Sequence, residues 1–581
     1  MRGFFKLVLA NLTAIFIVIA GFFVFFIAFL VLSSISTTPE VKSDSILTLD
    51  LNTKIIDSPT EDQEDFLSFG NDEKPVLLYD ILQAIKNAKT DNKIKGISIE
   101  SDDINAGITQ LADIRDALID FKKSGKFVYA YGNGISQGSY YLGSVADQYY
   151  LHPMGGIMLK GMAAEVTFFK DFADKYGIGI QVIRHGKFKA AVEPYLRNDI
   201  SPENREQLSV LLNDMWDHTS SQISKSRKIS TENFKTITDS LYGVLPNLCL
   251  KNNLVDKLSQ KSEYDYMIKS KLGIEKDKKL NKISFAKYAE TIDPASDSKR
   301  IAILYASGQI FDGKGYDGIY SENFIREIKK IQKDDDIKAV VLRINSPGGS
   351  ANASDCILYE LQNLKHKKPL IVSFGDYAAS GGYYIAMGAD KIFSEPNTLT
   401  GSIGVFGMIP YFKELAEKNG IRSDVVSTNT NANMFSTING VTPGTLNILT
   451  KNVELTYQRF VHFVTENRKK SFQEIDAIGG GRVWSGTRAK QLGLVDEVGS
   501  LQDAINYAAK SANLKQYGIS SYPAKISKFE QFFSKEMEDD FSTKLIKNKL
   551  GKENFRLFQQ ITEPKAKTSV MMEMPYSIKL N

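Results

Sequence analysis

Cysteine is scarce in this chain of 581 residues, which contains only Cys249 and Cys356. Two cysteines can form at most one bridge, so a disulfide framework and a cysteine metal cluster are excluded. We expect two free, buried thiols. An excess of charge of one sign is also missing, because 72 Lys and Arg residues against 68 Asp and Glu leave a net charge of +4. That balance does not favour nucleic acid as a partner. The length and the 43% hydrophobic content predict more than one folded domain.

Charge is absent altogether from one stretch near the N-terminus. No residue between Lys6 and Glu40 is charged, and the 21 residues of Leu12–Leu32 are almost wholly apolar. A helix of about 20 such residues crosses a bilayer core. The apolar stretch is too long for the alternative, a cleavable signal peptide, and Leu-Ser-Ser is a poor cleavage site. Arg2 and Lys6 precede the span, which predicts a cytoplasmic N-terminus. We therefore expect residues 1–40 to be a single-pass anchor in the inner membrane of a two-membrane bacterium, with the rest of the chain in the periplasm.

The remainder of the chain contains an internal repeat. Ile94–Asp103 resembles Ile337–Ser346, and Lys126–Gly161 resembles Pro369–Gly404, in both cases at an offset of 243 positions. Strand-like runs alternate with helix-like runs, which indicates βαβ units and a mostly parallel sheet in each copy. The sequence therefore predicts an α/β protein built from two copies of one domain. The expected bounds are 45–265 and 298–512 for the two repeats, 266–297 for a connecting segment and 513–581 for a charged C-terminal tail of unknown role.

The most informative stretch of the second copy is Pro369–Gly407. Its beginning, up to Phe374, predicts a buried strand, a turn follows at Gly375–Tyr377, and Ser380 then opens a helix. A serine at such a junction holds its hydroxyl at a helix N-terminus, and glycines after it, beginning with Gly381, let a substrate carbonyl approach the backbone amides. The alternative is that Ser380 is an ordinary helix N-cap.

A second glycine-rich turn lies upstream of that stretch. The buried strand predicted at Ala339–Ile344 is followed by Ser-Pro-Gly-Gly, ending at Gly348 and Gly349. Such a turn exposes amides that no side chain blocks, which suits an anion or an oxyanion, and an ordinary tight turn is the alternative. Counting back 243 positions from Ser380 gives Gln137, and counting back from the two glycines gives Asn105 and Ala106. The first copy therefore lacks both a nucleophile and the glycine turn.

Taken together, the ASGG sequence around Ser380, the SPGG sequence around Gly349 and TLTGSIGVFG at Thr398–Gly407 resemble the signal peptide peptidase A family. These are serine peptidases of the Clp-protease/crotonase superfold. The likeness extends from about residue 45 to 512 and matches the long, two-repeat form. It implies two tandem Clp-protease/crotonase-like repeats behind one transmembrane helix. It also implies a membrane-anchored homotetramer that cuts signal peptides left in the bilayer, with no cofactor and no metal.

The resemblance further implies the site residues. The family uses a Ser-Lys dyad, with its lysine in a YKSAVEP-like motif of the first repeat. Here Phe188–Pro194 reads FKAAVEP, which places the general base on Lys189 and the nucleophile on Ser380. A lysine must be desolvated to act as a base near neutral pH, so we expect Lys189 to be buried between the halves. The remaining implied positions are the amides of Gly349 and Gly381 as the oxyanion hole, and Ser402 as the residue that orients the lysine.

Several alternatives stay open. Lys187 is a rival candidate for the base, and a Ser-His-Asp triad would need one of the five histidines. The protein could instead be a crotonase-like acyl-thioester enzyme or a non-catalytic membrane scaffold, and as a peptidase it could also clear misfolded envelope proteins. The histidines are His152, His185, His218, His366 and His462.

Overall fold

The structure is a computed structural model that describes residues 39–59, 75–292, 298–524 and 571–574, together with residues 3, 10–11, 13–22 and 25. Residues 13–22 are helical. The predicted span Leu12–Leu32 lies partly outside the described residues. Among the residues described, no helix is long and apolar enough to cross a bilayer. We call residues 39–292 the first half and residues 298–524 the second half.

The first half is built on a parallel sheet with strand order β8-β6-β5-β4-β1-β9. Its strands are β1 (Ser45–Leu49), β4 (Ile94–Ile99), β5 (Phe127–Ile135), β6 (Gln148–Ile157), β8 (Lys257–Leu258) and β9 (Lys282–Ser284). A short parallel pair lies beside it, β2 (Ile55–Ile56) and β3 (Val76–Leu77). The first-half helices are α2 (Leu78–Thr90), α3 (Ile108–Lys122), α4 (Gln137–Gly143), α5 (Lys170–Tyr176), α6 (Glu193–Leu196), α7 (Pro202–Arg227), α8 (Thr231–Asp239), α9 (Pro246–Lys251), α10 (Lys261–Lys271) and α11 (Phe285–Ala289), with 3-10 turns at Ala190–Val192 and Tyr242–Val244.

The second half repeats this plan with strand order β19-β17-β15-β13-β10-β21. Every pairing in that order is parallel except β17 with β19. The strands are β10 (Arg300–Ser307), β13 (Ile337–Ser346), β15 (Leu370–Ala379), β17 (Leu399–Gly401), β19 (Val483–Ser485) and β21 (Gly518–Tyr522), with β16 (Lys391–Ser394) paired to β15 and β20 (Glu497–Val498) paired to β16. The second-half helices are α12 (Ser321–Lys333), α13 (Ala351–Lys365), α14 (Gly381–Ala386), α15 (Lys413–Lys418), α16 (Pro443–Arg468), α17 (Phe472–Ile478), α18 (Gly486–Gln491) and α19 (Leu501–Ser511).

The internal repeat is visible in the helices as well as in the sheets. Helices α12 and α13 follow α2 and α3 at the same offset of 243 positions and have the same lengths. The long helices α7 and α16 both have 26 residues, begin with proline after a Ser or Thr N-cap, and end at a lysine in the left-handed conformation. The predicted α/β fold with mostly parallel sheets is therefore confirmed.

Both sheets extend beyond the bounds expected from the sequence. Strand β9 pairs with β1, although its residues were expected in the connecting segment. Strand β21 pairs with β10, although its residues were expected in the tail. In each case a short run with little apolar character of its own becomes an outer strand because it completes the hydrogen bonding of the neighbouring strand.

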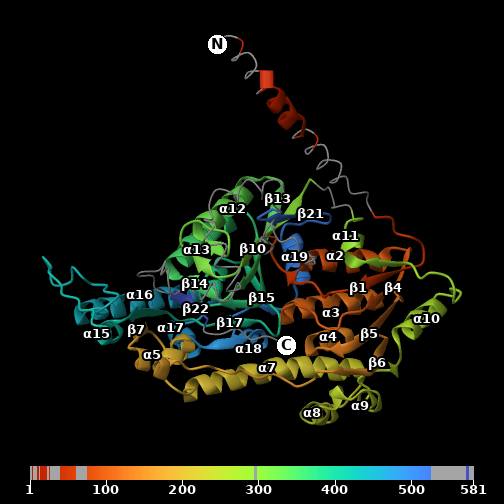
Figure 1. The fold of residues 1–581 in the computed structure, drawn as a ribbon, viewed down its shortest axis with the longest axis horizontal. Coiled ribbons are helices and arrows are strands. Elements are labelled where there is room, and N and C mark those ends of the chain that lie inside the picture. Colours follow the sequence, from red (N-terminus) through yellow and green to blue (C-terminus); the bar gives the residue numbers. More distant parts are fainter. Residues whose placement is uncertain are drawn as a thin grey trace.

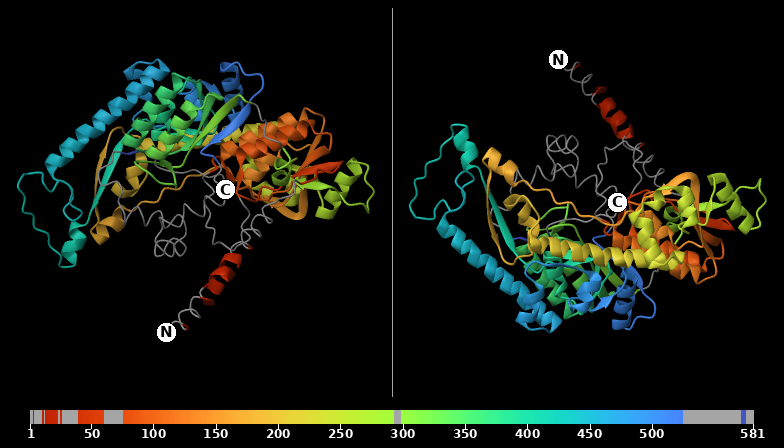
Figure 2. Two further views of the ribbon diagram at one scale, coloured as in Figure 1. Left: turned by 90° about the horizontal axis from the view of Figure 1, so that it is seen from above. Right: turned by 90° about the horizontal axis from the view of Figure 1, so that it is seen from below.

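A third sheet, with the strand order β12-β11-β14-β22-β18-β7, joins the two halves. Strand β7 of the first half pairs antiparallel with β18 of the second, and Figure 2 shows this pair at the end of the molecule opposite the first sheet. The polypeptide of the first half therefore reaches across the second half before it turns back. The strands are β7 (Gly179–Arg184), β11 (Ile310–Phe311), β12 (Ile319–Tyr320), β14 (Gly348–Ser350), β18 (Phe406–Tyr411) and β22 (Met571–Glu573).

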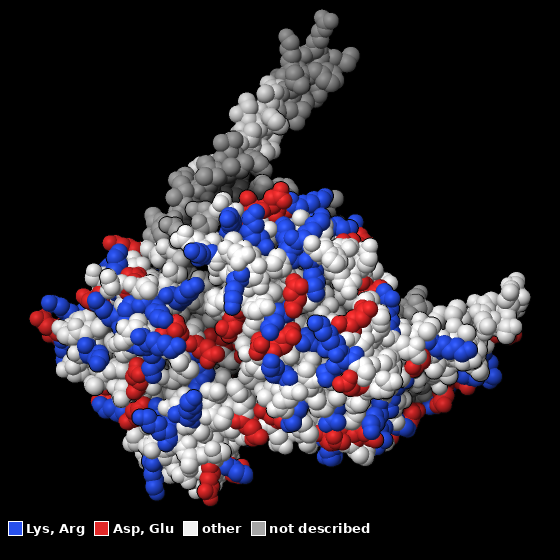
Figure 3. Space-filling view, turned by 180° about the vertical axis from the view of Figure 1, so that it is seen from behind, with Lys and Arg blue, Asp and Glu red and all other residues white. Residues whose placement is uncertain are grey.

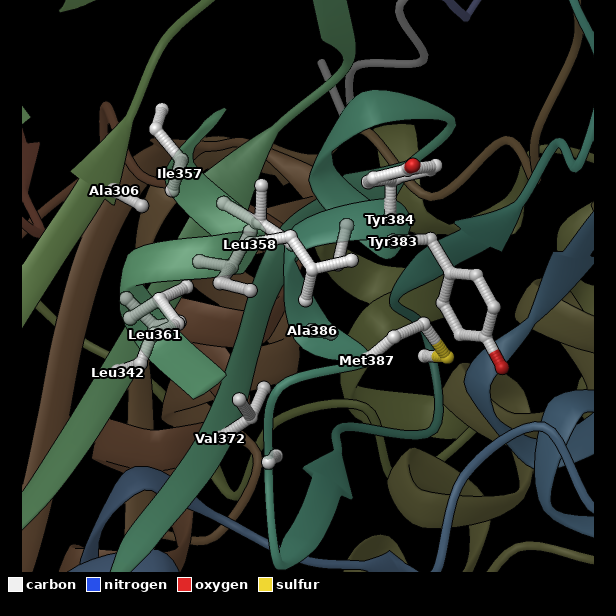
Figure 4. Close-up of a cluster of buried hydrophobic side chains, with 14 of the residues drawn as sticks. Ala306, Leu342, Ile357, Leu358, Leu361, Val372, Tyr383, Tyr384, Ala386 and Met387 are labelled. Atoms are coloured by element: carbon white, nitrogen blue, oxygen red, sulfur yellow. The ribbon is translucent and has the colours of Figure 1, made fainter. Parts of the chain in front are cut away.

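The largest core cluster lies in the second half, beneath helix α14. Leu358 and Leu361 of α13 are buried against Tyr383, Tyr384 and their neighbours at the start of α14 (Figure 4). This packing holds the end of β15 and the first turn of α14 in place. Cys249 is buried, as expected, whereas Cys356 is exposed because it lies on the solvent-facing side of α13.

The outer surface carries both signs of charge. Over the face shown in Figure 3, Lys and Arg side chains are interleaved with Asp and Glu, in keeping with a net charge of +4. This face therefore has no broad basic field of the kind that attracts nucleic acid.

Candidate active site

Ser380 lies at the junction of β15 and α14, and its backbone is strained. Its φ of 55° and ψ of −116° fall in a region that residues other than glycine rarely occupy. Although Ser380 stands at the N-cap position, its side chain accepts no hydrogen bond from the helix, so the N-cap alternative is wrong. The turn expected at Gly375–Tyr377 is also absent, because β15 continues to Ala379 by pairing with β17. The hydroxyl of Ser380, at the end of β15, is therefore fully buried and makes no capping hydrogen bond to α14.

Lys189 reaches this hydroxyl from the other half of the chain. Strand β7 carries the segment across, and the amide of Phe188 donates a hydrogen bond to the carbonyl of Gly480. The Lys189 side chain is fully buried, and its Nζ lies 2.8 Å from the Oγ of Ser380. The ring of Phe406 packs beside the amine at 5.9 Å. Two residues separated by 191 positions therefore meet in a closed space.

Ser402 contacts the same amine. Its Oγ lies 3.0 Å from the Nζ of Lys189 and its carbonyl oxygen lies 3.3 Å away. A φ of 49° turns the serine toward the lysine, and its amide is held by the carbonyl of Arg482 at 2.7 Å. Ser380 Oγ, Ser402 Oγ and the Ser402 carbonyl oxygen are uncharged partners of Nζ, and these contacts fix the position of the amine.

The predicted oxyanion glycines lie side by side at the same place. A Cβ added to Gly381 would lie 3.2 Å from the amide nitrogen of Gly349, and one added to Gly348 would lie 2.7 Å from that of Gly381. Gly348 and Gly349 have φ values of 105° and 154°, which side chains disfavour. The amides of Gly349 and Gly381 thus line one small space next to Ser380.

The alternative bases lie elsewhere. Lys187 is exposed, and its Nζ lies over the ring of Phe188 at 5.3 Å. His185 is held by Glu454 at 2.6 Å and stacks on Tyr457, and none of the five histidines is among the hydrogen-bond partners of Ser380 in the described structure. No group of three or more potential metal ligands occurs within the described ranges.

A buried charge cluster beneath the site ties the halves together. Arg343 on β13 is fully buried and contacts Asp57 at 3.1 Å and Asp113 at 3.5 Å, both from the first half. Asp376 on β15 accepts hydrogen bonds from the amide and the hydroxyl of Thr109, each at 2.9 Å. Burial raises the pKa of Asp113 to about 6 against the opposing effect of Arg343, and burial likewise raises the pKa of Asp376.

Sequence reasoning missed this cluster and the glycine turn that holds the lysine. The cluster gives no signal, because its residues are isolated charges in unrelated segments. The turn Gly479–Gly481 is visible as three consecutive glycines. A Cβ at Gly481 would lie 2.7 Å from the amide nitrogen of Lys189, so only glycine lets the segment that carries Lys189 approach this closely.

Comparison with known proteins agrees with the fold and the duplication. Residues 295–400 match the family model for Clp protease, and residues 120–274 and 362–515 match the model described as Peptidase family S49. The chain is therefore a serine protease with two tandem Clp-protease-like repeats.

It belongs to peptidase family S49, and its relatives place it with the long SppA-type members. "Protease 4" of Haemophilus influenzae is 34% identical over 520 residues, 86% of this chain and 84% of that protein. "Protease 4" of Salmonella typhi is 36% identical over 456 residues, 77% of this chain and 74% of that protein. "Serine protease SPPA, chloroplastic" of Arabidopsis thaliana is 32% identical over 489 residues, which are 82% of this chain and 70% of that protein. Family membership favours a peptidase over an acyl-thioester enzyme or a scaffold.

Proposed function

We propose that the protein is a membrane-anchored endopeptidase that hydrolyses cleaved signal peptides and other envelope peptides, with Ser380 as nucleophile and Lys189 as general base. The observation that carries the proposal is the buried contact of 2.8 Å between Lys189 Nζ and Ser380 Oγ. A serine hydroxyl is a weak nucleophile unless a base within hydrogen-bond reach removes its proton.

The state of the lysine supports this role. A free lysine is almost entirely charged near neutral pH, and a charged amine cannot accept a proton. Burial penalises the charged form of an amine, so enclosure between the two halves makes the neutral form accessible. The Oγ and the carbonyl oxygen of Ser402 can accept the two N–H bonds of a neutral amine, which leaves its lone pair for the Ser380 hydroxyl.

The reaction then follows in balanced steps. Neutral Lys189 takes the proton of Ser380 while Oγ bonds to the peptide carbonyl carbon, whose oxygen becomes an oxyanion. The amides of Gly349 and Gly381 stabilise this oxyanion, and each such donor contributes about 2.7–4 kcal/mol. The lysine ammonium then protonates the leaving amine as the C–N bond breaks. Water, deprotonated by Lys189, attacks the acyl ester and releases the second product, which restores Ser380.

The setting of the enzyme is part of the same proposal. The apolar stretch Leu12–Leu32 supports an anchor in the inner membrane, with the N-terminus cytoplasmic and the two halves periplasmic. An anchored site would meet peptides that remain in the bilayer, which favours apolar substrates. The likeness to the signal peptide peptidase A family supports signal peptides as substrates and a homotetramer as the assembly.

The test is cleavage of a fluorogenic apolar peptide, together with labelling by a serine-directed phosphonate, using the full chain in detergent. Ser380→Ala and Lys189→Met should each lower kcat by at least about 10⁴-fold, since members of such a unit act together. Lys187→Met is the matched control and should keep wild-type activity, because that lysine is exposed.

Thermal unfolding of each variant separates loss of chemistry from loss of structure. Full activity in Lys189→Met, with its melting temperature unchanged, would rule out Lys189 as the base. Activity that fails in Lys187→Met instead would transfer the role to the rival lysine.

A further inference from the structure

A short piece of the C-terminal tail lies inside the candidate site. Strand β22 (Met571–Glu573) pairs antiparallel with β14, so that Met572 faces Gly349 and Glu573 faces Gly348. On its other side Met571 pairs with Phe406 of β18. The tail thus fills the strand position between β14 and β18, where Figure 1 labels β22 beside β14.

The register brings one carbonyl of the tail to the two glycine amides. The amide of Met574 donates a hydrogen bond to the carbonyl of Pro347 at 2.8 Å. Hydrogen-bonded pairs alternate along an antiparallel ladder, so the next such pair is Met572 with Gly349. A Cβ added to Gly348 would lie 2.0 Å from the Met572 carbonyl oxygen and 2.7 Å from the Gly381 amide nitrogen. The Met572 carbonyl oxygen therefore lies beside the two glycines whose amides are the proposed oxyanion donors.

The side chains of the segment are anchored as well. Met572 is 1% exposed and belongs to the core cluster of the second half. Met574 is 6% exposed and belongs to a cluster formed by both halves, which includes Leu211 and Met215 of α7 from the first half and Ala379 and Leu399 from the second. Full burial of a methionine side chain contributes about 1.5–3 kcal/mol.

We propose that residues 571–574 are a built-in pseudosubstrate, which occupies the strand position of a peptide substrate and competes with it. The proposal rests on the proposed function, because it takes the amides of Gly349 and Gly381 as the oxyanion hole. An extended peptide binds a sheet edge by main-chain hydrogen bonds, with pockets for alternate side chains. Met572 and Met574 are such alternate side chains, and both occupy apolar pockets.

Competition in cis has a kinetic signature. The segment belongs to the same chain, so dilution of the enzyme does not release it, whereas a high concentration of peptide displaces it. Weakening the segment should therefore lower KM for an apolar peptide and leave kcat unchanged. The Met572→Asp variant of the full chain weakens it by forcing a carboxylate into an apolar pocket.

The first measurement compares peptide cleavage by wild type, Met572→Asp and Met154→Asp. Met154 is the matched control, a methionine that is 86% exposed in the first half. We expect KM to fall at least fivefold in Met572→Asp, with kcat and KM unchanged in Met154→Asp. An unchanged KM in both Met572→Asp and a second variant, Met574→Asp, would overturn the proposal while cleavage by wild type upholds the function.

The second measurement does not depend on catalysis. A fluorescent peptide with the sequence of residues 568–576 is titrated against Ser380→Ala and against Ser380→Ala/Met572→Asp, and anisotropy reports binding. At least tenfold tighter binding to the double variant supports the pseudosubstrate, even if no form cleaves peptide. Equal binding to the two variants would overturn it. Failure of the proposed function and failure of this inference therefore give different results.

Discussion

Ser380 and Gln137 are equivalent positions of the duplication, yet their surroundings differ. Gln137 begins α4 behind Ser136, which has an ordinary φ of −69° and caps the helix with its hydroxyl. The buried side chain of Gln137 accepts hydrogen bonds from the amides of Lys160 and Gly161 and donates one to the carbonyl of Gly161. In the second half the hydroxyl of Ser380 does not cap α14. The φ of Ser380 is 55°, and its hydroxyl contacts Lys189 instead. The same junction therefore has ordinary backbone geometry and local hydrogen bonds in one half, whereas in the other half its backbone is strained and its hydroxyl contacts Lys189.

The segment that carries Lys189 in the first half also differs from its equivalent in the second half. The arm after β7 carries Lys189 into the second half, whereas the equivalent position in the second half is Ala432, which lies in an exposed segment. Under the proposed mechanism, the first half therefore carries the base without a nucleophile, and the second half carries the nucleophile without a base. Neither half alone contains the pair, so the site depends on how firmly the halves are joined.

Breaking the buried charge cluster that joins the two halves should have the largest effect on stability and activity. Arg343→Met removes the only guanidinium described between Asp57 and Asp113 and leaves their buried carboxylates uncompensated. Loss of one partner of such a buried pair costs about 3–5 kcal/mol. We expect a fall of that size in the free energy of unfolding by urea, with loss of activity as the halves separate. Arg326→Met, at an exposed arginine, is the control and should leave stability within about 0.5 kcal/mol.

Making the second half resemble the first at the glycine turn should remove activity with less damage to the fold. Gly349→Ala copies Ala106, but its Cβ would lie 2.1 Å from the carbonyl oxygen of Ile310. The amide is displaced, and loss of one oxyanion donor lowers kcat by about 10²–10³-fold. The reverse change, Ala106→Gly, should not alter kcat. An active Gly349→Ala enzyme would contradict the oxyanion role of that amide.

The pKa of Asp113, in the buried charge cluster between the halves, determines how stability should depend on pH. Burial raises the pKa of Asp113 to about 6, so the folded chain holds a proton that the unfolded chain has lost between about pH 4 and 6. Stability from this group is therefore present below pH 4 and declines as pH rises to 6. Asp113→Asn should flatten the dependence of the unfolding free energy on pH in this window, by on the order of 1–3 kcal/mol. A profile identical to wild type would remove Asp113 as the titrating group.

The two halves also show which features a single sequence can reveal. The constant offset of 243 positions and the alternation of strands and helices predicted the parallel sheets, because those elements carry their own apolar patterns. The pairing of Lys189 with Ser380 came from likeness to a family, since no local pattern links positions 191 residues apart. The structure brings these two and Ser402 together, and places Gly349 beside Gly381.

The third sheet could not be predicted, for a physical reason. Strands β11 and β12 consist of strand-favouring residues but have only two residues each, too few to give a strand pattern, and β14 consists of two glycines and a serine, which do not favour strands. They are extended because neighbours from distant segments pair with them. The left-handed conformation of Ser380 and the burial of Met572 likewise arise from tertiary contacts, which a sequence pattern does not contain.

Ser402 tests whether the lysine is oriented or merely buried. Ser402→Ala removes the Oγ at 3.0 Å from Nζ but keeps the carbonyl contact at 3.3 Å. One hydrogen bond contributes about 0.5–1.5 kcal/mol, which corresponds to roughly a twofold to tenfold fall in kcat. Ser402→Thr keeps a hydroxyl and should recover part of the rate. A shift of the pH–rate profile in Ser402→Ala, absent in Ser402→Thr, would assign the effect to the amine, whereas equal profiles and rates would leave Ser402 without an orienting role.

The smallest effect on activity is expected from placing a serine at position 137 of the first half. Gln137→Ser gives α4 the residue found at Ser380 but supplies neither a lysine nor a glycine turn, so we expect no second active site. The loss of the glutamine's hydrogen bonds to residues 160 and 161 should lower the unfolding free energy by roughly 1–2 kcal/mol. Serine labelling of Gln137→Ser in the Ser380→Ala background measures this directly. Labelling above the Ser380→Ala level would show that the junction alone activates a serine, and the complementary loss between the halves would then not explain where the chemistry lies.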